Sequence, residues 1–314
     1  MAARDVVLLF PGQGSQKVGM GADLAAADPR ARAVFEAADA ALDIPLSRLC
    51  FEGPDDELMR TENAQPALLT HGAAAWAVVS TVLRPSVRAA AGHSLGEFTA
   101  HHAAGALSLA DALQLVRRRG EVMAMSGAKR PGGMAAILGA DEEVVEAACR
   151  KASDSGVVVP ANYNAPDQLV ISGEVEAVER AMGLARDSGA KRAIRLKVSG
   201  AFHSPLMAVA ADGLEAALSA ASFGLPAFPI YANVSAEPVS EPATARRLLL
   251  EQLVSPVRWT GTIRALTAMY PEALYVELGP GVVLSNLVKR IASGTETAAC
   301  GTATDVDALL ARFS

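Results

Sequence analysis

Short apolar segments alternate with helical segments along most of this sequence, and no other feature restricts its fold as strongly. The first apolar run, DVVLLF at residues 5–10, is followed by a glycine-rich loop. Helical spacing of apolar residues then recurs over residues 29–42 and over residues 65–83. Strands that alternate with helices are typical of a mostly parallel sheet with helices packed on it. The sequence therefore predicts an α/β fold.

Residues 133–198 depart from this simple alternation. The predicted order there is strand, helix, strand, strand, helix, strand, in the segments MAAILG, DEEVVEAACRKA, VVVPANYN, QLVISG, EVEAVERAMGLARDSG and AIRLKVS. This βαββαβ order is the ferredoxin-like plan. We therefore predict a small ferredoxin-like domain at residues 129–198. It is inserted into a large α/β domain that is made of residues 1–128 and 199–314.

The large domain continues on both sides of the insert. Before it, RPSVRAAAG leads into a serine-containing turn, and Ser108 with Asp111 three residues later is typical of a helix N-cap. We expect that helix to reach about residue 125. After the insert we expect a helix from Ser204, the strand FPIYANV, a helix near residues 243–254, the strand LYVEL and a last helix, VVLSNLVKRI.

Composition and spacing argue against several functional classes. The net charge is −6 and no block is rich in lysine and arginine, whereas nucleic-acid binding needs a clustered basic surface. The three cysteines are far apart and the histidines form no HxxxH or HExxH pattern, so we expect no disulfide frame and no metal site. The first apolar run is too short for a secretion signal or a membrane span. We expect a globular, cytoplasmic protein.

One candidate for chemistry is Ser94, in the pattern Gly92-His93-Ser94-Leu95-Gly96. Gly-x-Ser-x-Gly between a strand and a helix is the pattern of a nucleophile elbow, in which the glycines allow a cramped turn. Ser94 would lie at a helix N-terminus, where the N–H of Leu95 can stabilise an oxyanion. The motif is short, and VRAAAG lacks the β-branched residues typical of a strand. A serine that merely caps the helix is the alternative.

A nucleophilic serine needs a base, and the sequence offers five histidines. His203 follows the last strand of the insert, in a loop where the chain rejoins the large domain, so it is well placed to reach a cleft between domains. His71, His93, His101 and His102 are less suitable by position. In α/β-hydrolases the histidine follows the acid near the C-terminus, but here more than a hundred residues follow His203. We therefore predict a Ser–His dyad with the imidazole oriented by a main-chain carbonyl.

The other candidate is Arg119, in the segment LADALQLVRRRGEVMAM. Helical spacing places Arg119 on the apolar stripe, between Val116 and Met123. A guanidinium on the inner face of a helix is costly unless an anion meets it. Two interpretations stay open: a buried ion pair with Asp or Glu, or a fork that binds a substrate carboxylate by two parallel hydrogen bonds.

Eight motifs, in this order, resemble those of one enzyme family. They are PGQGSQ at 11–16, TENAQPALL at 61–69, GHSLGE at 92–97, RRRG at 117–120, ANYNAPDQLVISG at 161–173, GAFH at 200–203, PVRW at 256–259 and ELGPG at 277–281. Together they resemble the malonyl-CoA:acyl-carrier-protein transacylases, over almost the whole chain. The resemblance implies a hydrolase-like large α/β domain with an inserted ferredoxin-like subdomain.

The resemblance also implies roles for particular residues. Ser94 would be the acylated nucleophile and His203 its general base, then acid. The remaining roles would be an oxyanion hole from the backbone N–H groups of Gln13 and Leu95, a malonyl carboxylate site at Arg119, a carbonyl near Gln252 that orients His203, and pocket walls from Gln65, Asn162 and Phe202. Phe202 and Leu95 resemble malonyl-selective members. Val282 departs from the lysine that often follows GPG in the family, and the loop SGAKRPGG is short.

The implied function is transfer of a malonyl group from malonyl-CoA to the phosphopantetheine thiol of an acyl carrier protein, for fatty-acid synthesis. The reaction would be ping-pong, need no metal or redox cofactor, and be carried out by a monomer. Two anionic partners would need a basic rim, which we place at Lys129, Arg130, Lys191 and Arg192. A discrete polyketide acyltransferase, a serine thioester hydrolase and a non-catalytic acyl-binding module are the alternatives.

Overall fold

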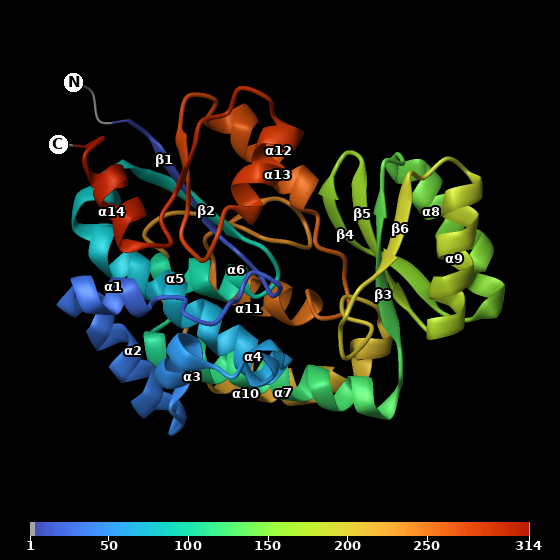
Figure 1. Cartoon of the computed structure of the whole chain (residues 1–314), viewed down its shortest axis with the longest axis horizontal. Helices are drawn as coiled ribbons and strands as arrows, with labels where there is room; N and C mark the ends of the chain where they lie inside the picture. The colour runs from blue at the N-terminus through green and yellow to red at the C-terminus, as the bar shows by residue number, and fades with distance from the viewer. Residues whose placement is uncertain (1–3, 314) are drawn as a thin grey trace.

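The computed structural model describes residues 4–313, and within them the strands form two sheets (Figure 1). The larger sheet has six strands in the order β10-β9-β1-β2-β7-β8. All neighbours in it are parallel except β7 and β8. The strands are β1 (Val6–Phe10), β2 (Val87–Gly92), β7 (Ile230–Tyr231), β8 (Pro238–Val239), β9 (Leu274–Glu277) and β10 (Thr297–Ala299).

Helices cover both faces of the larger sheet. Alternate side chains of a strand point to opposite faces, and in β1 those on both faces are apolar and buried. In β1, Leu8 and Phe10 pack in one core, whereas Val7 and Leu9 pack in another. The first core includes residues of α2 (Pro29–Leu42), α5 (Thr61–Leu83), α6 (Gly96–Ala103) and α7 (Leu109–Lys129). The second includes residues of α12 (Trp259–Met269) and α13 (Val283–Ile291). The predicted α/β class, with a mostly parallel sheet flanked by helices, is confirmed.

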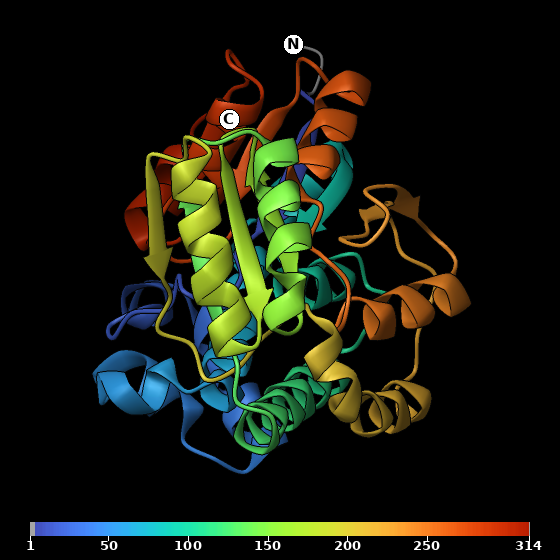
Figure 2. The ribbon, with the colours of Figure 1, turned by 90° about the vertical axis from the view of Figure 1, so that its right-hand side faces the viewer.

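The second sheet is antiparallel, with the strand order β4-β5-β3-β6. Its elements are β3 (Gly133–Leu138), α8 (Glu142–Ala152), β4 (Val158–Ala165), β5 (Gln168–Gly173), α9 (Val175–Asp187) and β6 (Arg192–Arg195). The two helices cover its outer face, as Figure 2 shows, and pack on Ile137 and Ile171. Met134 and Val170 point the other way and join the core of the larger unit. The open face of this sheet therefore lies toward the larger sheet.

Three elements differ from the sequence prediction. The strand predicted over residues 193–199 ends at Arg195, because Leu196 to Val198 leave the sheet and line a cavity. The strand FPIYANV is reduced to β7, because Asn233 turns toward the end of β2 and bonds to the backbone there. The helix expected from Ser204 begins as a 3-10 turn, Pro205–Ala210, before α10 (Ala211–Ala220).

Several short elements were not predicted. These are α1 (Ala22–Ala27), α3 (Leu46–Glu52), α4 (Asp55–Met59), α14 (Ala303–Leu310), β8, β10 and the helix α12. Most have fewer than nine residues, and helices this short depend on packing rather than on their own periodicity. The helix expected near residues 243–254 is α11 (Pro242–Glu251), and the Ser108 hydroxyl caps α7 by accepting from the N–H of Asp111.

The central helix α5 is unusually apolar. The stretch Thr61–Ser86 is long and apolar enough to cross a membrane by length and composition alone. However, 78% of its most apolar window is buried inside the protein, where α5 contacts α2 and α7. This burial is that of a core helix.

Candidate active site

Ser94 lies on a strained turn between β2 and α6. Its φ is 51°, in the left-handed region that a residue with a Cβ rarely adopts. A Cβ on Gly92 would lie 1.9 Å from the carbonyl carbon of Gly96, and one on Gly96 would lie 2.0 Å from the oxygen of Phe10. Glycine is therefore required at both positions. The small residues of β2 form a strand despite their low strand propensity, because β2 lies between β1 and β7 in the sheet.

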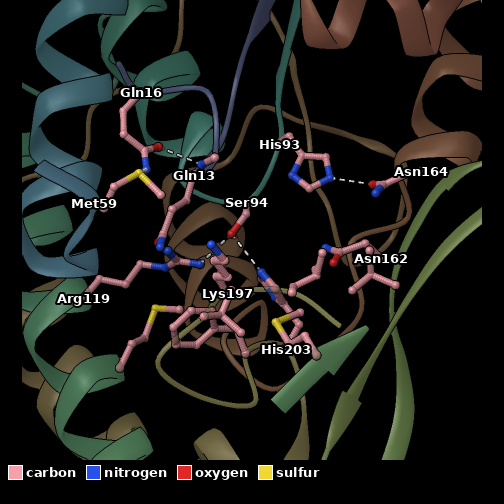
Figure 3. A pocket seen from close by; sticks show the side chains of 17 residues that line it. Gln13, Gln16, Met59, His93, Ser94, Arg119, Asn162, Asn164, Lys197 and His203 are labelled. Carbon is pink, nitrogen blue, oxygen red and sulfur yellow. Dashed lines mark hydrogen bonds between the residues drawn. The ribbon is translucent and has the colours of Figure 1, made fainter. Parts of the chain in front are cut away.

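Ser94 is hydrogen-bonded to His203 (Figure 3). The distance from Ser94 Oγ to His203 Nε2 is 2.8 Å. His203 Nδ1 donates to the carbonyl oxygens of Gln252, at 2.9 Å, and Ser255, at 3.2 Å. Since both partners are acceptors, Nδ1 carries the proton and Nε2 is free to accept one from the hydroxyl. Burial, together with the positive charge of Arg119, lowers the pKa of His203 to about 3, so the ring is neutral at neutral pH.

Arg119 reaches the same point from α7, with only 1% of its surface exposed. Its Nη2 donates to Ser94 Oγ and to Gln252 Oε1, both at 2.9 Å, and its Nη1 donates to Gln65 Oε1 at 2.8 Å. Burial lowers the pKa of Arg119 to about 10, so the guanidinium stays charged. It forms no ion pair with a carboxylate of residues 4–313. A buried ion pair was one of the two interpretations that the sequence left open. Arg119 is thus a buried cation held by neutral groups.

The three side chains face a cavity of about 360 Å³ between the two sheets (Figure 3). Apolar side chains from both units form much of its wall: Met59, Met123, Met134, Val170, Leu196, Val198 and Phe202. Arg119 and Lys197 are its cationic residues, and none of the described residues that line it is acidic. A cavity with this lining suits a ligand that has an apolar arm and an anionic end.

Of the other candidate site residues, three line this cavity, whereas Gln65, Leu95 and Gln252 do not. Gln13, Asn162 and Phe202 line it. Gln65 does not: it lies behind Arg119 and accepts a hydrogen bond from it. The backbone N–H groups of Gln13 and Leu95 donate no hydrogen bond within residues 4–313, so both are available to an oxyanion.

Sequence reasoning set His93 aside and did not single out Asn233 or Glu97, although all three belong to the site. His93 lines the cavity although it adjoins Ser94, and its Nε2 lies 2.8 Å from Asn164 Oδ1. Asn233 Oδ1 accepts from the N–H of Ser94 at 2.6 Å, and its Nδ2 donates to Gly92 O at 2.7 Å. Glu97, fully buried, accepts from Gln252. Asn233 follows β7 at the carboxyl end of a parallel strand, a place where binding residues often gather, and that position was the available signal.

The buried histidines give the protein a stability that depends on pH. Burial lowers the pKa of His71 and of His101 to about 4 from an ordinary 6.5, as it does more strongly for His203. The folded state therefore binds fewer protons than the unfolded chain below pH 6.5, so stability is lost as the pH falls through that value. Glu97 acts in the opposite direction, because burial raises its pKa to about 7.

The histidines outnumber the carboxylates whose pKa is raised, so we expect a net loss of roughly 2–4 kcal/mol in unfolding free energy between pH 7 and pH 5. Urea unfolding at the two pH values measures it. The loss should shrink in His101→Gln, because that ring is fully buried and its Nδ1 has no partner. An unfolding free energy that is equal or higher at pH 5 would contradict the expectation.

A serine on a strained strand-to-helix turn, hydrogen-bonded to a neutral imidazole, is typical of α/β enzymes in which a serine is acylated. Residues 7–309 match the acyl transferase domain family, and the chain belongs to that family. It is 46% identical over 289 residues to the malonyl CoA-acyl carrier protein transacylase of Bacillus subtilis (strain 168). The aligned residues cover 91% of this chain and 90% of that one. The protein of the same name from Escherichia coli (strain K12) is 43% identical over 283 residues, or 90% of this chain and 91% of that one.

Solved structures agree. The acyl-carrier-protein-S-malonyltransferase from Bartonella henselae superposes with a TM-score of 0.94 at 41% identity, over 98% of this chain and 99% of that one. A malonyl-transacylase solved in complex with its type II PKS acyl-carrier protein gives a TM-score of 0.93 at 39% identity, over 98% and 99% of the two chains. The family that the sequence motifs resemble is confirmed.

Proposed function

We propose that the protein transfers a malonyl group from malonyl-CoA to the phosphopantetheine thiol of an acyl carrier protein, through a malonyl ester of Ser94, and so supplies extender units for fatty-acid synthesis. One observation carries the proposal: the buried guanidinium of Arg119 is held by neutral groups among the described residues, and its Nη2 lies 2.9 Å from Ser94 Oγ. A malonyl group on that oxygen ends in a carboxylate, which a single methylene separates from the ester carbonyl. It is short enough to meet this guanidinium in a charge-assisted pair.

In the first half-reaction, His203 Nε2 takes the hydroxyl proton as Ser94 Oγ attacks the thioester carbonyl. The carbon–sulfur bond then breaks, and the CoA thiolate takes the proton from His203. In the second, the carrier thiol gives its proton to His203 and attacks the ester, and Ser94 Oγ recovers the proton as it leaves. The oxyanion of each step would accept from the N–H groups of Gln13 and Leu95. No step requires a metal or a redox cofactor.

The surrounding residues would position these groups. Gln65 and the side chain of Gln252 hold the guanidinium of Arg119, while the main-chain carbonyl of Gln252 fixes the tautomer of His203. Asn162 and Phe202 would limit the space beside the acyl group. A bulkier acyl group would have less room in this lining, and this supports selectivity for malonyl.

The division of the chain into two domains supports an enzyme whose active site lies between them. We infer a large domain of residues 1–128 and 199–314, of which residues 1–3 and 314 lie outside the described residues, and a ferredoxin-like domain at residues 129–198. A hydrophobic core of its own and the strand order β4-β5-β3-β6 support the second assignment. We infer a cytoplasmic monomer.

The carrier protein and CoA would approach the open side of the cavity. A related malonyl-transacylase has been solved with an acyl-carrier protein, and this supports such a partner here. Lys191, Arg192 and Lys197 are exposed, and Lys197 lines the cavity itself. Lys129 and Arg130 are exposed at the end of α7, where Arg130 pairs with Glu174 at 3.5 Å. Lys197 is thus an exposed cation at the cavity, whereas Arg192 pairs with Leu138, at the other end of β3 from the cavity-lining Met134. An exposed cation at the cavity suits two anionic partners.

The lifetime of the acyl-enzyme tests this function against its rivals. We expect intact-mass spectra to show one malonyl adduct after mixing with malonyl-CoA, stable in buffer and discharged on addition of a carrier protein with its phosphopantetheine arm. A thioester hydrolase would lose the adduct in buffer alone at a similar rate, and a binding module would form none. A carrier protein without the arm is the control. Comparing fatty-acid and polyketide carriers as acceptors distinguishes the two pathways.

A further inference from the structure

Glu97 lies in the first turn of α6, three residues after the nucleophile, and is 1% exposed. Its Oε2 accepts from Gln252 Nε2 at 2.7 Å and from the backbone N–H of Asn233 at 3.1 Å. Both partners also bond to the backbone of Ser94: Gln252 Nε2 donates to its carbonyl oxygen at 3.0 Å, and Asn233 Oδ1 accepts from its N–H. The dyad mechanism gives this carboxyl group no role.

The amide of Gln252 connects Glu97 to Arg119. Its nitrogen faces the Glu97 carboxyl group and its oxygen faces Arg119 Nη2, at 2.9 Å. An amide dipole between an anion and a cation is stable only in this orientation. Glu97 is also the group whose charge opposes the lowering of the Arg119 pKa by burial. Glu97 therefore balances a buried cation that has no direct carboxylate partner within residues 4–313.

We propose that Glu97 is a positioning residue that sets acyl selectivity. Through Gln252 it orients the Arg119 guanidinium, and its negative charge competes with the carboxylate of the incoming acyl group for the positive charge of Arg119. The proposal rests on the proposed function, in which Arg119 binds the malonyl carboxylate. Two carboxylates on one guanidinium repel each other, so an ionised Glu97 weakens malonyl binding relative to that of an uncharged acyl group. Glu97 thus limits how tightly the malonyl group is held.

Glu97→Gln isolates the charge, because a glutamine can still accept from Gln252 and from the N–H of Asn233. We expect the ratio of kcat/KM for malonyl-CoA to that for acetyl-CoA to rise roughly fivefold, mainly through a lower KM for malonyl-CoA. In the Arg119→Ala background the same substitution should leave the ratio as it is in Arg119→Ala alone. The matched control is Glu277→Gln, which neutralises another fully buried carboxyl group that accepts from the backbone of α13 and does not contact Arg119.

The wild-type enzyme offers a second measurement that needs no variant. Burial raises the pKa of Glu97 to about 7. The ionisable groups around it are Arg119, charged throughout, and His203 and His101, whose lowered pKa values keep them neutral above pH 6. As the pH rises from 6 to 8, Glu97 ionises, so the malonyl-to-acetyl ratio should fall several-fold. Titration of the CoA phosphates affects both substrates and cancels in the ratio.

Each outcome bears on one proposal. If Arg119→Ala lowers the ratio while Glu97→Gln does not raise it and the wild-type ratio is flat with pH, the role of Glu97 is overturned and the proposed function stands. If Glu97→Gln lowers kcat/KM for malonyl-CoA and for acetyl-CoA by the same factor, Glu97 is merely structural. A rise that persists without Arg119 also overturns the proposal. If Arg119→Ala itself leaves the ratio unchanged, the proposed function fails.

Discussion

Replacing Ser94 with alanine is expected to abolish the malonyl adduct and to lower the transfer rate by at least roughly 10⁴-fold. The reason is that both half-reactions pass through the Ser94 oxygen, and no other hydroxyl lies beside His203 among the described hydrogen bonds. Alanine keeps the Cβ and therefore the same strain at φ 51°, so the variant should fold as the wild type does. Intact mass after mixing with malonyl-CoA and a carrier-transfer assay measure the two effects.

The control for this loss is Ser188→Ala, at the exposed end of α9 and not among the residues that line the cavity. It should retain both the adduct and the transfer rate. Thermal unfolding of Ser94→Ala within a few degrees of the wild type would exclude misfolding as the cause. A malonyl adduct that still forms on Ser94→Ala would place the nucleophile elsewhere and contradict the mechanism.

The parts of this site that local sequence encodes could be predicted. Gly92 and Gly96 are needed because a Cβ at either would clash, and that requirement is visible in a five-residue pattern. The burial of Arg119 follows from helical spacing alone. Likewise, the element order of residues 133–198 follows from alternating periodicities and agrees with the structure. Each of these signals lies within one or two turns of chain.

The partners of these groups could not be predicted, because they come from distant segments. Asn233 lies 139 residues from Ser94, and the Gln252 side chain that contacts Arg119 lies 133 residues from it. What brings them together is the sheet order β10-β9-β1-β2-β7-β8, in which β7 pairs with β2 although residues 93–229 lie between them in the chain. No local pattern specifies that pairing. For the same reason an ion pair for Arg119 was an open interpretation, whereas amide groups hold it.

Replacing Arg119 with alanine is expected to lower kcat/KM for malonyl-CoA by roughly 10³-fold and to reduce the value for acetyl-CoA much less. A carboxylate paired with a guanidinium in a dry cavity loses two charge-assisted hydrogen bonds in the variant, whereas an acetyl group has no carboxylate to lose. The kcat/KM of Arg119→Lys for malonyl-CoA should lie between those of the wild type and Arg119→Ala, because an ammonium has the charge but lacks the planar fork. Competition assays with both CoA esters measure the ratio directly.

The matched control is Arg118→Ala, on the same helix but on its exposed face, where the guanidinium lies 3.7 Å from Glu121. Since Arg118 does not line the cavity, its loss should leave the malonyl-to-acetyl ratio at the wild-type value. Arg119→Ala is expected to lower stability, because it leaves a cavity and removes the donor that the side-chain oxygens of Gln65 and Gln252 share. Thermal unfolding must therefore show that the variant is folded before its selectivity is interpreted. An unchanged ratio in a folded Arg119→Ala variant would show that this guanidinium does not recognise the malonyl carboxylate, and it would contradict the proposed function.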